Sequence, residues 1–402
     1  LFLDQGFSDP IIFSNYGAIL KDLKNLQKAE ILMRKAIELK PDFAEAYCNL
    51  GNIYEDLGKL EEAELLTRKA IKLKPDFENA YFNLGNLLQE LGRLEESEIS
   101  LRKAIEINPD YVEAHFNLAS ICLNLSKLEE AKISYKRVIE LDPNYAVAHA
   151  WLGRILIKQS KNDLAIQYLS KCCCLLREDR KNNPDQLKSF GMISKAKIDH
   201  DIEQFDYLVS QGIDTKKFTE LGNLYRKVAS EINWPSETKL TPLVDEPQRL
   251  LKDSYNHLIH QMDAPILTAS AVNDSLNADE ITNNYFDHEF GLTYIDDFLS
   301  PKALDSLRKF LLGSTIWFEV KKGGYLGAYL KDGLASPLIL QIAEELRNKF
   351  PKIFKDYPIN EIWAYKYDSR AKNEDSSLKG INVHADFAAI NVNFWITPSE
   401  AN

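Results

Sequence analysis

The sequence predicts a multidomain protein in which an all-α solenoid of helix pairs is followed by a smaller α+β domain. Three observations support this fold class. Pro41, Pro75, Pro109 and Pro143 follow one another at intervals of 34 residues, a period typical of stacked helical repeats. The register is lost in the charged segment after Glu178, as expected at a domain boundary. Beyond residue 284 the chain alternates apolar and polar residues in the manner of short strands.

The composition is that of a soluble globular chain. Of 402 residues, 49 are basic and 60 acidic, and the net charge of −11 disfavours a nucleic-acid reader, which carries a basic surface. No apolar stretch approaches the ~20 residues that span a bilayer, and no secretory signal is recognisable. We therefore expect a cytoplasmic protein without nucleic-acid or membrane partners. The chain starts at Leu1 with no polar cap, so we expect it to be a fragment with further repeats upstream.

The five cysteines fit a reducing compartment. Cys172, Cys173 and Cys174 are consecutive, and no C-x-x-C pair occurs. We expect buried or half-buried thiols on helices rather than a metal or redox site.

The repeat divides into five units of 34 residues that start at residue 10, and the solenoid as a whole is predicted to span residues 1–179. Residues 1–9 read as the tail of a preceding helix. In the second unit, Gly58 is predicted to end the first helix, and Pro75 to end the second at Lys74. The units cover residues 10–43, 44–77, 78–111, 112–145 and 146–179.

The unit "AYCNLGNIYEDLGKLEEAELLTRKAIKLKPDF" resembles the tetratricopeptide (TPR) repeat in its period and in several of its columns. This resemblance implies a right-handed superhelix of antiparallel helix pairs, whose concave face binds an extended peptide or a partner helix.

Asparagines recur at fixed columns of the repeat and form the candidate peptide-binding surface. Each carboxamide offers a donor and an acceptor, which suits sequence-tolerant binding of a peptide backbone. A similar ladder lines the groove of the tetratricopeptide part of O-linked N-acetylglucosamine transferases. The alternative that these side chains serve only helix packing stays open. The candidates are Asn15, Asn49, Asn83 and Asn117, with Asn52 and Asn86 one turn further on.

Residues 180–265 are predicted to form a helical connector, with helices near 195–210, 215–232 and 247–260. In the domain at 284–402, "EFGLTYIDDFLS" is predicted to be a short strand, and "KKGGYLGAY" a turn before a helix. Ser300–Pro301 and Ser336–Pro337 are predicted to begin two helices. The acidic triplets at 199–201 and 287–289 are predicted to be surface charge.

His384 and Asp386 carry the candidate metal chemistry. They are two residues apart on a predicted strand, so their side chains project to the same face. An Fe(II) site of the facial-triad type uses two His and one carboxylate, so these two residues could be ligands and a second His is needed. The segment from about Phe290, through "INEIWAYKYDS" to "VHADFAAINVNFWIT", looks like the front part of a 2-oxoglutarate/Fe(II)-dependent dioxygenase of the prolyl-hydroxylase-like branch. The resemblance implies a double-stranded β-helix (jelly roll), Fe(II), and 2-oxoglutarate as cosubstrate. Its distal His and its basic residue for the cosubstrate would lie beyond Asn402.

Four further residues are candidates for the cofactor pocket. Tyr365 and Tyr367 share a strand face, and in the family a tyrosine in this region often hydrogen-bonds the cosubstrate. A core-facing aromatic is the alternative. Asn391 and Asn393 share a face of the next predicted strand, where they line the pocket or face solvent.

The leading hypothesis is a peptide-binding solenoid that delivers substrates to an Fe(II) oxygenase, which hydroxylates a protein or peptide side chain. For the 402-residue chain itself we expect weak metal binding and no turnover, because the ligand triad is incomplete. The alternative is a non-catalytic tetratricopeptide scaffold with a degenerate jelly-roll domain.

Overall fold

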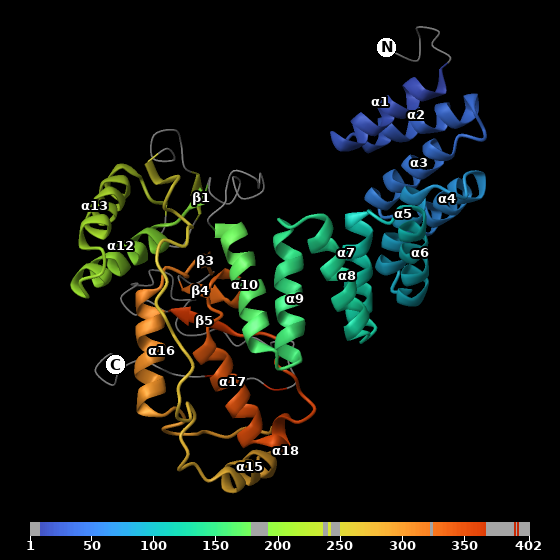
Figure 1. Cartoon of the computed structure of the whole chain (residues 1–402). Helices are drawn as coiled ribbons and strands as arrows, with labels where there is room; N and C mark the ends of the chain where they lie inside the picture. Colours follow the sequence, from blue (N-terminus) through green and yellow to red (C-terminus); the bar gives the residue numbers. More distant parts are fainter. Residues whose placement is uncertain are drawn as a thin grey trace. The chain divides into compact units, whose positions relative to one another are not determined.

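The computed structural model describes residues 9–177, 192–235, 240–242, 250–321, 325–366, 390 and 392–393. Across these residues the protein is mostly helical, with sixteen α-helices and five short strands (Figure 1). None of the described helices combines the length and the apolar character that crossing a bilayer requires. The chain divides into two compact units, Leu1–Ala148 and His149–Asn402, and each is described by itself.

The first unit is an array of antiparallel helix pairs, and its helices begin in the predicted register. The first helices of successive units start at residues 10, 44, 78 and 112, which confirms the 34-residue period. The helices are α1 (Pro10–Asp22), α2 (Leu26–Leu39), α3 (Ala44–Asp56), α4 (Leu60–Leu73), α5 (Glu78–Glu90), α6 (Leu94–Ile107), α7 (Val112–Asn124) and α8 (Leu128–Leu141). The helix α9 (Ala146–Lys158) begins the fifth pair, which α10 (Asn162–Arg177) completes.

Small residues and turn geometry set this array. Ala63 and Ala70 of α4 are fully buried, so the paired helices approach closely. Gly58 has φ +73° directly after α3, and the chain turns there, as predicted. The backbone of Lys74, the residue before Pro75, is extended, and α4 ends there.

The second unit contains α12 (Lys195–Ser210) and α13 (Thr215–Glu231), which form a pair close to the predicted positions. Phe205 packs edge-on against Tyr225 and is stacked on Phe218 in its core. The third predicted connector helix is wrong over its described part. The helix there ends at Leu251, and residues 252–256 form turns, with Asn256 at φ +58°.

The second unit also contains four further helices and a small antiparallel sheet. The helices are α15 (Ala278–Asp287), α16 (Pro301–Gly313), α17 (Pro337–Lys349) and α18 (Pro351–Phe354), with the 3₁₀ turn η3 at Leu330–Asp332. The sheet has the order β3-β4-β5, with β3 (Glu319–Val320), β4 (Leu326–Tyr329) and β5 (Trp363–Lys366). A separate antiparallel pair joins β1 (Met192–Ile193) to β2 (Thr241–Pro242).

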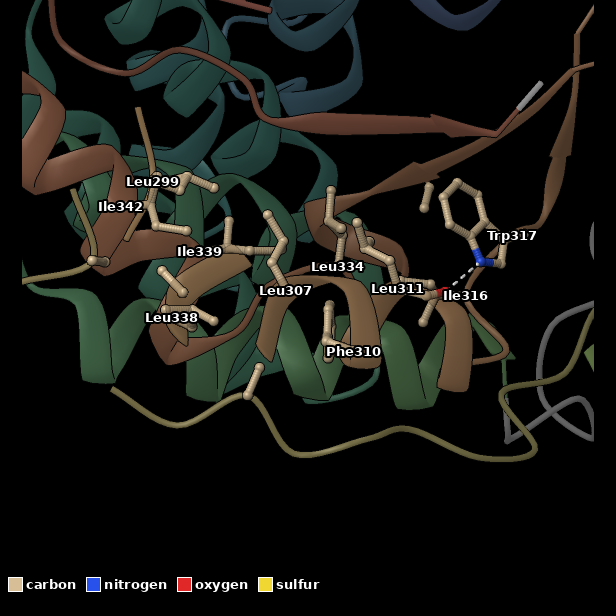
Figure 2. Close-up of a cluster of buried hydrophobic side chains, with 14 of the residues drawn as sticks. Leu299, Leu307, Phe310, Leu311, Ile316, Trp317, Leu334, Leu338, Ile339 and Ile342 are labelled. Atoms are coloured by element: carbon tan, nitrogen blue, oxygen red, sulfur yellow. Dashed lines mark hydrogen bonds between the residues drawn. The ribbon is translucent and has the colours of Figure 1, made fainter. Parts of the chain in front are cut away.

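The caps of α16 and α17 are the predicted ones. Ser300 accepts a hydrogen bond from the amide of Ala303, and Ser336 accepts one from the amide of Ile339, each with proline at the first helical position. Figure 2 shows the apolar side chains of these two helices packed together with those of the neighbouring segments. The indole of Trp317 closes one end of this core and donates to the carbonyl of Leu311 at 3.1 Å.

Two local predictions in this unit are wrong, one of a strand and one of a turn. The segment at 289–300 is coil, and within it Leu299 alone makes an isolated bridge to Val272. Phe290 and Tyr294 of this segment are exposed, and no strand of the described residues covers them. In the segment that was predicted to be a turn before a helix, residues 326–329 form β4, which pairs with β3 and therefore belongs to a sheet. The described residues thus contain a three-stranded sheet, and the double-stranded β-helix stays a prediction.

Candidate peptide-binding surface

The repeated asparagines lie on the first helix of each pair. In α3, α5 and α7 the small and aliphatic residues of the repeat face the second helix of the pair, and Leu50, Leu84 and Leu118 are buried there. The asparagines are half-buried beside these residues, and Asn83 and Asn117 contact the first helix of the preceding repeat. Asn49 and Asn52 of α3 are three residues apart, as are Asn83 and Asn86 of α5. Each such pair therefore shares one helix face.

Hydrogen bonds link the carboxamides of neighbouring repeats. The Nδ2 of Asn83 donates to the Oδ1 of Asn52 at 2.8 Å, which joins α5 to α3. The Nδ2 of Asn117 donates to the Oδ1 of Asn86 at 2.8 Å, which joins α7 to α5 in the same way. Two of the predicted columns therefore form one hydrogen-bonded series.

The series changes at its first repeat. In the first repeat, Ala18 occupies the column of Asn52 and Asn86, so Asn49 has no carboxamide partner there. The Nδ2 of Asn49 instead donates to the Oγ of Ser14 at 3.4 Å. Asn15 of α1 is exposed. In α9 the column holds Trp151, as the sequence shows. The linked carboxamides are therefore those of α3, α5 and α7.

Each linked pair keeps one acceptor and one donor for a ligand. The Oδ1 atoms of Asn83 and Asn117 accept no hydrogen bond from any described residue, and the Nδ2 atoms of Asn52 and Asn86 donate none. A peptide group likewise carries one N–H donor and one C=O acceptor. The arrangement can therefore bind a peptide backbone without reading its side chains.

Aromatic rings adjoin the carboxamides. Phe82 and Phe116 directly precede Asn83 and Asn117 and pack against Tyr111 and Tyr145, with ring centroids 4.9 and 5.1 Å apart. Burial raises the pKa of Tyr111 to about 12, so its hydroxyl stays neutral and donates to the Oδ1 of Asn79 at 2.8 Å. These half-buried rings give the surface apolar contact area beside its hydrogen-bonding groups.

An acidic group continues the same helix face. Glu55 lies three residues after Asn52 and is half-buried. Burial, together with the neighbouring carboxylates of Glu90 and Asp56, raises the pKa of Glu55 above its ordinary value, although Lys21 opposes the shift. A cation bound here would relieve the repulsion among the three carboxylates.

The candidates for the cofactor site lie mostly outside the described residues: His384, Asp386, Tyr367 and Asn391. Tyr365 is on β5, where its ring meets Tyr325 edge-on at 5.1 Å and its hydroxyl is 3.5 Å from that of Tyr329. Asn393 is exposed.

The sequence did not predict a buried ionic group in the second unit. Lys197 and Asp201 of α12 form a buried ion pair, and the imidazole Nδ1 of His200 lies 3.2 Å from the same carboxylate. The predicted surface location of this triplet is therefore wrong for His200 and Asp201. Burial lowers the pKa of His200 to about 4, so the ring is neutral. Burial alone would raise the pKa of Asp201, but the Lys197 ammonium outweighs it and lowers the pKa.

A second group of ligand-type side chains joins α6, α7 and α8. Glu98, Cys122 and Glu130 have potential ligand atoms within 4.8 Å of one another. Glu98, however, pairs with Arg102 at 2.8 Å and with Lys127 at 2.6 Å, and Glu130 also pairs with Arg102. Burial raises the pKa of Cys122, which favours the neutral thiol. The cations thus already balance these carboxylates, and the group is an ion-pair network. The five cysteines are buried or half-buried thiols on helices, as predicted.

Models of the tetratricopeptide repeat match the chain throughout this array. One model matches residues 44–77 and 112–145, a second matches 12–43 and 78–111, and a third matches 134–167. No match was found among curated protein sequences.

Several solved structures are similar to this chain over part of its length. The crystal structure of MamA is 22% identical, with a TM-score of 0.37, covering 39% of this chain and 91% of that one. YrrB, described as "a TPR protein with an unusual peptide-binding site", is 24% identical, with a TM-score of 0.37, covering 46% and 94%. PilF of Pseudomonas aeruginosa is 22% identical, with a TM-score of 0.40, covering 44% and 79%. From the family models and the register of the helices, residues 12–167 are tetratricopeptide repeats.

Proposed function

We propose that this array binds an extended segment of a protein partner along the first-helix face of α3, α5 and α7. Binding of proteins or peptides is the function that the tetratricopeptide repeats support. The observation that carries the more specific proposal is the pair of carboxamide links, Asn83 to Asn52 and Asn117 to Asn86.

The links favour backbone binding because they fix the side chains before the ligand arrives. A free asparagine loses rotamer freedom when it binds, whereas a linked one has already lost it. Each peptide hydrogen bond replaces one to water and contributes about 0.5–1.5 kcal/mol. Several such bonds along the array, together with contacts to the aromatic rings, are needed for useful affinity.

The acidic end of the face sets a preference among peptides. Glu55 and Glu90 would attract a lysine or arginine at the ligand position next to Asn52, whereas Asp56 already pairs with Lys21 and Lys24. We therefore propose an extended ligand with a basic residue at that end.

Selection from random peptides tests the proposal and does not require the natural partner. A phage-displayed library of such peptides is selected on the full chain, and the affinity of a selected peptide is then measured by calorimetry. Replacing Asn83 and Asn117 with alanine should weaken the affinity about tenfold or more, since each loses hydrogen bonds to the ligand. Asn144→Ala, in an exposed loop position, is the matched control and should leave the affinity unchanged. Equal affinity for wild type and the double variant would show that the asparagines serve only helix packing.

We propose, second, that the C-terminal part of the chain belongs to a 2-oxoglutarate/Fe(II)-dependent dioxygenase that hydroxylates the bound protein or peptide. The support is the sequence pattern around His384 and Asp386, which would be ligands of Fe(II). Both residues lie outside the described part of the chain, so no catalytic step is derived through the metal. A non-catalytic scaffold is the competing function.

A metal titration separates these two functions. Fe(II) is added to the full chain under anaerobic conditions, and binding is compared with that of His384→Ala and Asp386→Ala variants. We expect the full chain to bind Fe(II) weakly and each of the two substitutions to abolish this binding. His288→Ala, at an exposed histidine of the second unit, is the control. Binding that is unchanged in both ligand variants would refute the proposed metal site.

A further inference from the structure

The second helices of the first four pairs share an exposed aliphatic residue at one column. Ile31 of α2, Leu65 of α4, Ile99 of α6 and Ile133 of α8 follow one another at the 34-residue period. Their exposed fractions are 53%, 70%, 68% and 64%. We call these four residues the aliphatic row. The corresponding residue of α10 is Gln167, so the row ends with the fourth pair.

Packing within the array does not explain the row. The residues two positions earlier, Ala29, Ala63, Ser97 and Ala131, are fully buried and already fill the contact between paired helices. Single exposed aliphatic residues are common on protein surfaces, but a repeated set on one face marks an interaction site. The row therefore needs a partner outside its own array.

Charge is arranged on both sides of the row. Pairs of acidic residues precede Leu65, Ile99 and Ile133 by three and four positions, at 61–62, 95–96 and 129–130. Pairs of basic residues follow each residue of the row by three and four positions, at 34–35, 68–69, 102–103 and 136–137. At these spacings all of them share the helix face of the row. The face thus has an acidic edge, an apolar centre and a basic edge.

Some of these charges have no partner among the described residues. Glu61, Glu62 and Glu95 of the acidic edge are exposed and make no ion pair there, and Lys136 of the basic edge makes none either. The cations and carboxylates that do pair are also largely exposed, so those pairs contribute little to stability and can exchange partners.

A concave site adjoins the row between α4 and α6. It has a volume of about 560 Å³ and includes Ile99, with Ile71 and Leu84 among the apolar residues that line it. Arg68, Lys72 and Arg102 lie at the same site. It therefore suits an aliphatic side chain that has a carboxylate nearby, which is the combination that the row and its acidic edge present.

We propose that this face binds a second copy of the same chain, aliphatic row against aliphatic row. A second array has the same 34-residue period, so equivalent residues of successive repeats meet together. A two-fold axis parallel to the row places the acidic edge of each copy against the basic edge of the other, and the interface is self-complementary. This face belongs to the second helices, whereas the proposed peptide site belongs to the first helices. The inference is therefore independent of the proposed function.

Sedimentation analysis of the full chain over a wide range of concentration tests the inference. We expect a reversible dimer, and the double variant Leu65→Glu/Ile99→Glu should raise its dissociation constant about tenfold or more, because it places like charges at the centre of the contact. Ile266→Glu, at a residue of the second unit with 66% exposure, is the matched control and should leave dimerisation unchanged. A chain that stays monomeric throughout, or a dimer that the row variant does not weaken, would overturn the proposal.

Charge reversal provides a test that does not depend on loss of function alone. One variant carries lysine at Glu61, Glu62 and Glu95, and the other carries glutamate at Lys69, Lys103 and Lys136. Each should dimerise more weakly than the wild type by itself, because the substitutions cancel the charge of the acidic edge in one variant and reduce the charge of the basic edge in the other. An equimolar mixture should form a heterodimer. Circular dichroism of each variant verifies that it is folded, and a mixture of folded variants that does not associate would contradict the proposed interface.

Discussion

Paired helices approach closely at the repeat column that contains Gly17 and Gly85. We predict that alanine at this column changes stability differently in different repeats. A Cβ added at Gly85 of α5 would lie 2.7 Å from the Cγ and 2.8 Å from the Cδ2 of Leu101. The nearer of these two atoms is the branch point of Leu101, which can move aside only if the whole side chain moves. At the equivalent Gly17, an added Cβ would lie 2.9 Å from the terminal methyl of Met33, which is the end of a flexible side chain.

The expected change in the stability of each helix pair follows from these contacts. Alanine gains about 1 kcal/mol over glycine in a helix interior, whereas overpacking a core costs about 1–3 kcal/mol. Gly85→Ala should therefore destabilise its helix pair by up to about 2 kcal/mol. Gly17→Ala should be neutral or stabilising by up to about 1 kcal/mol, because Met33 can shift.

Amide hydrogen exchange measures these changes in the intact protein, because it reports the free energy of opening for each helix pair. Gly85→Ala should speed exchange in α5 and α6. The double variant Gly85→Ala/Leu101→Met should restore slow exchange. Methionine at position 101 then gives the third repeat the same flexible neighbour that Met33 provides beside Gly17 in the first repeat. Equal effects of Gly85→Ala and Gly17→Ala, or no recovery in the double variant, would refute this reasoning.

Three further predictions concern stability. Gly92 has φ +75° with open space around it, so Gly92→Ala should lower thermal stability by about 1 kcal/mol through backbone strain alone, and Ser126→Gly, at φ +60° in the same column, should raise it slightly. The raised pKa of Glu55 means that the folded state binds its proton more tightly than the unfolded state does. Stability should fall as the pH rises from about 4 towards neutral, and Glu55→Gln should remove this part of the dependence in melting curves. Asp201→Asn should cost about 3–5 kcal/mol in denaturant unfolding, because it leaves the buried Lys197 charge unpaired, whereas Asp199→Asn at a partly exposed pair should change little.

Local sequence signals predicted the array and the caps well. The 34-residue period placed the start of the first helix in each repeat of the first unit, because each repeat buries the same columns against its own partner helix. Ser300 and Ser336 were predictable for the same reason, since an N-cap depends on residues within one turn.

The errors concern features that depend on distant residues. The strand predicted at 289–300 has the right alternation, but among the described residues it has no neighbouring strand, and Leu299 alone makes a bridge. His200 and Asp201 have the composition of surface residues. Lys197 compensates their burial from one turn away, and residues far along the chain cover them, as where Gln204 donates to the carbonyl of Ser314 at 2.7 Å. The spacing of Lys197 and Asp201 on the apolar side of α12 was the one available signal.

The asparagine columns were predictable as candidates, but their links were not. A 34-residue period shows that Asn83 and Asn117 are equivalent, whereas it does not show that each reaches the following column of the preceding repeat. That contact depends on the stagger between neighbouring helix pairs, which only the folded array fixes.

Contact between the linked carboxamides and the backbone of a bound peptide can be measured by nuclear magnetic resonance of the asparagine side-chain amides, while a selected peptide is added to the full chain. We expect the signals of Asn52, Asn83, Asn86 and Asn117 to shift together and to saturate with the binding curve, while that of Asn144 stays in place. Saturable binding that leaves those four signals unmoved would show that the peptide binds elsewhere.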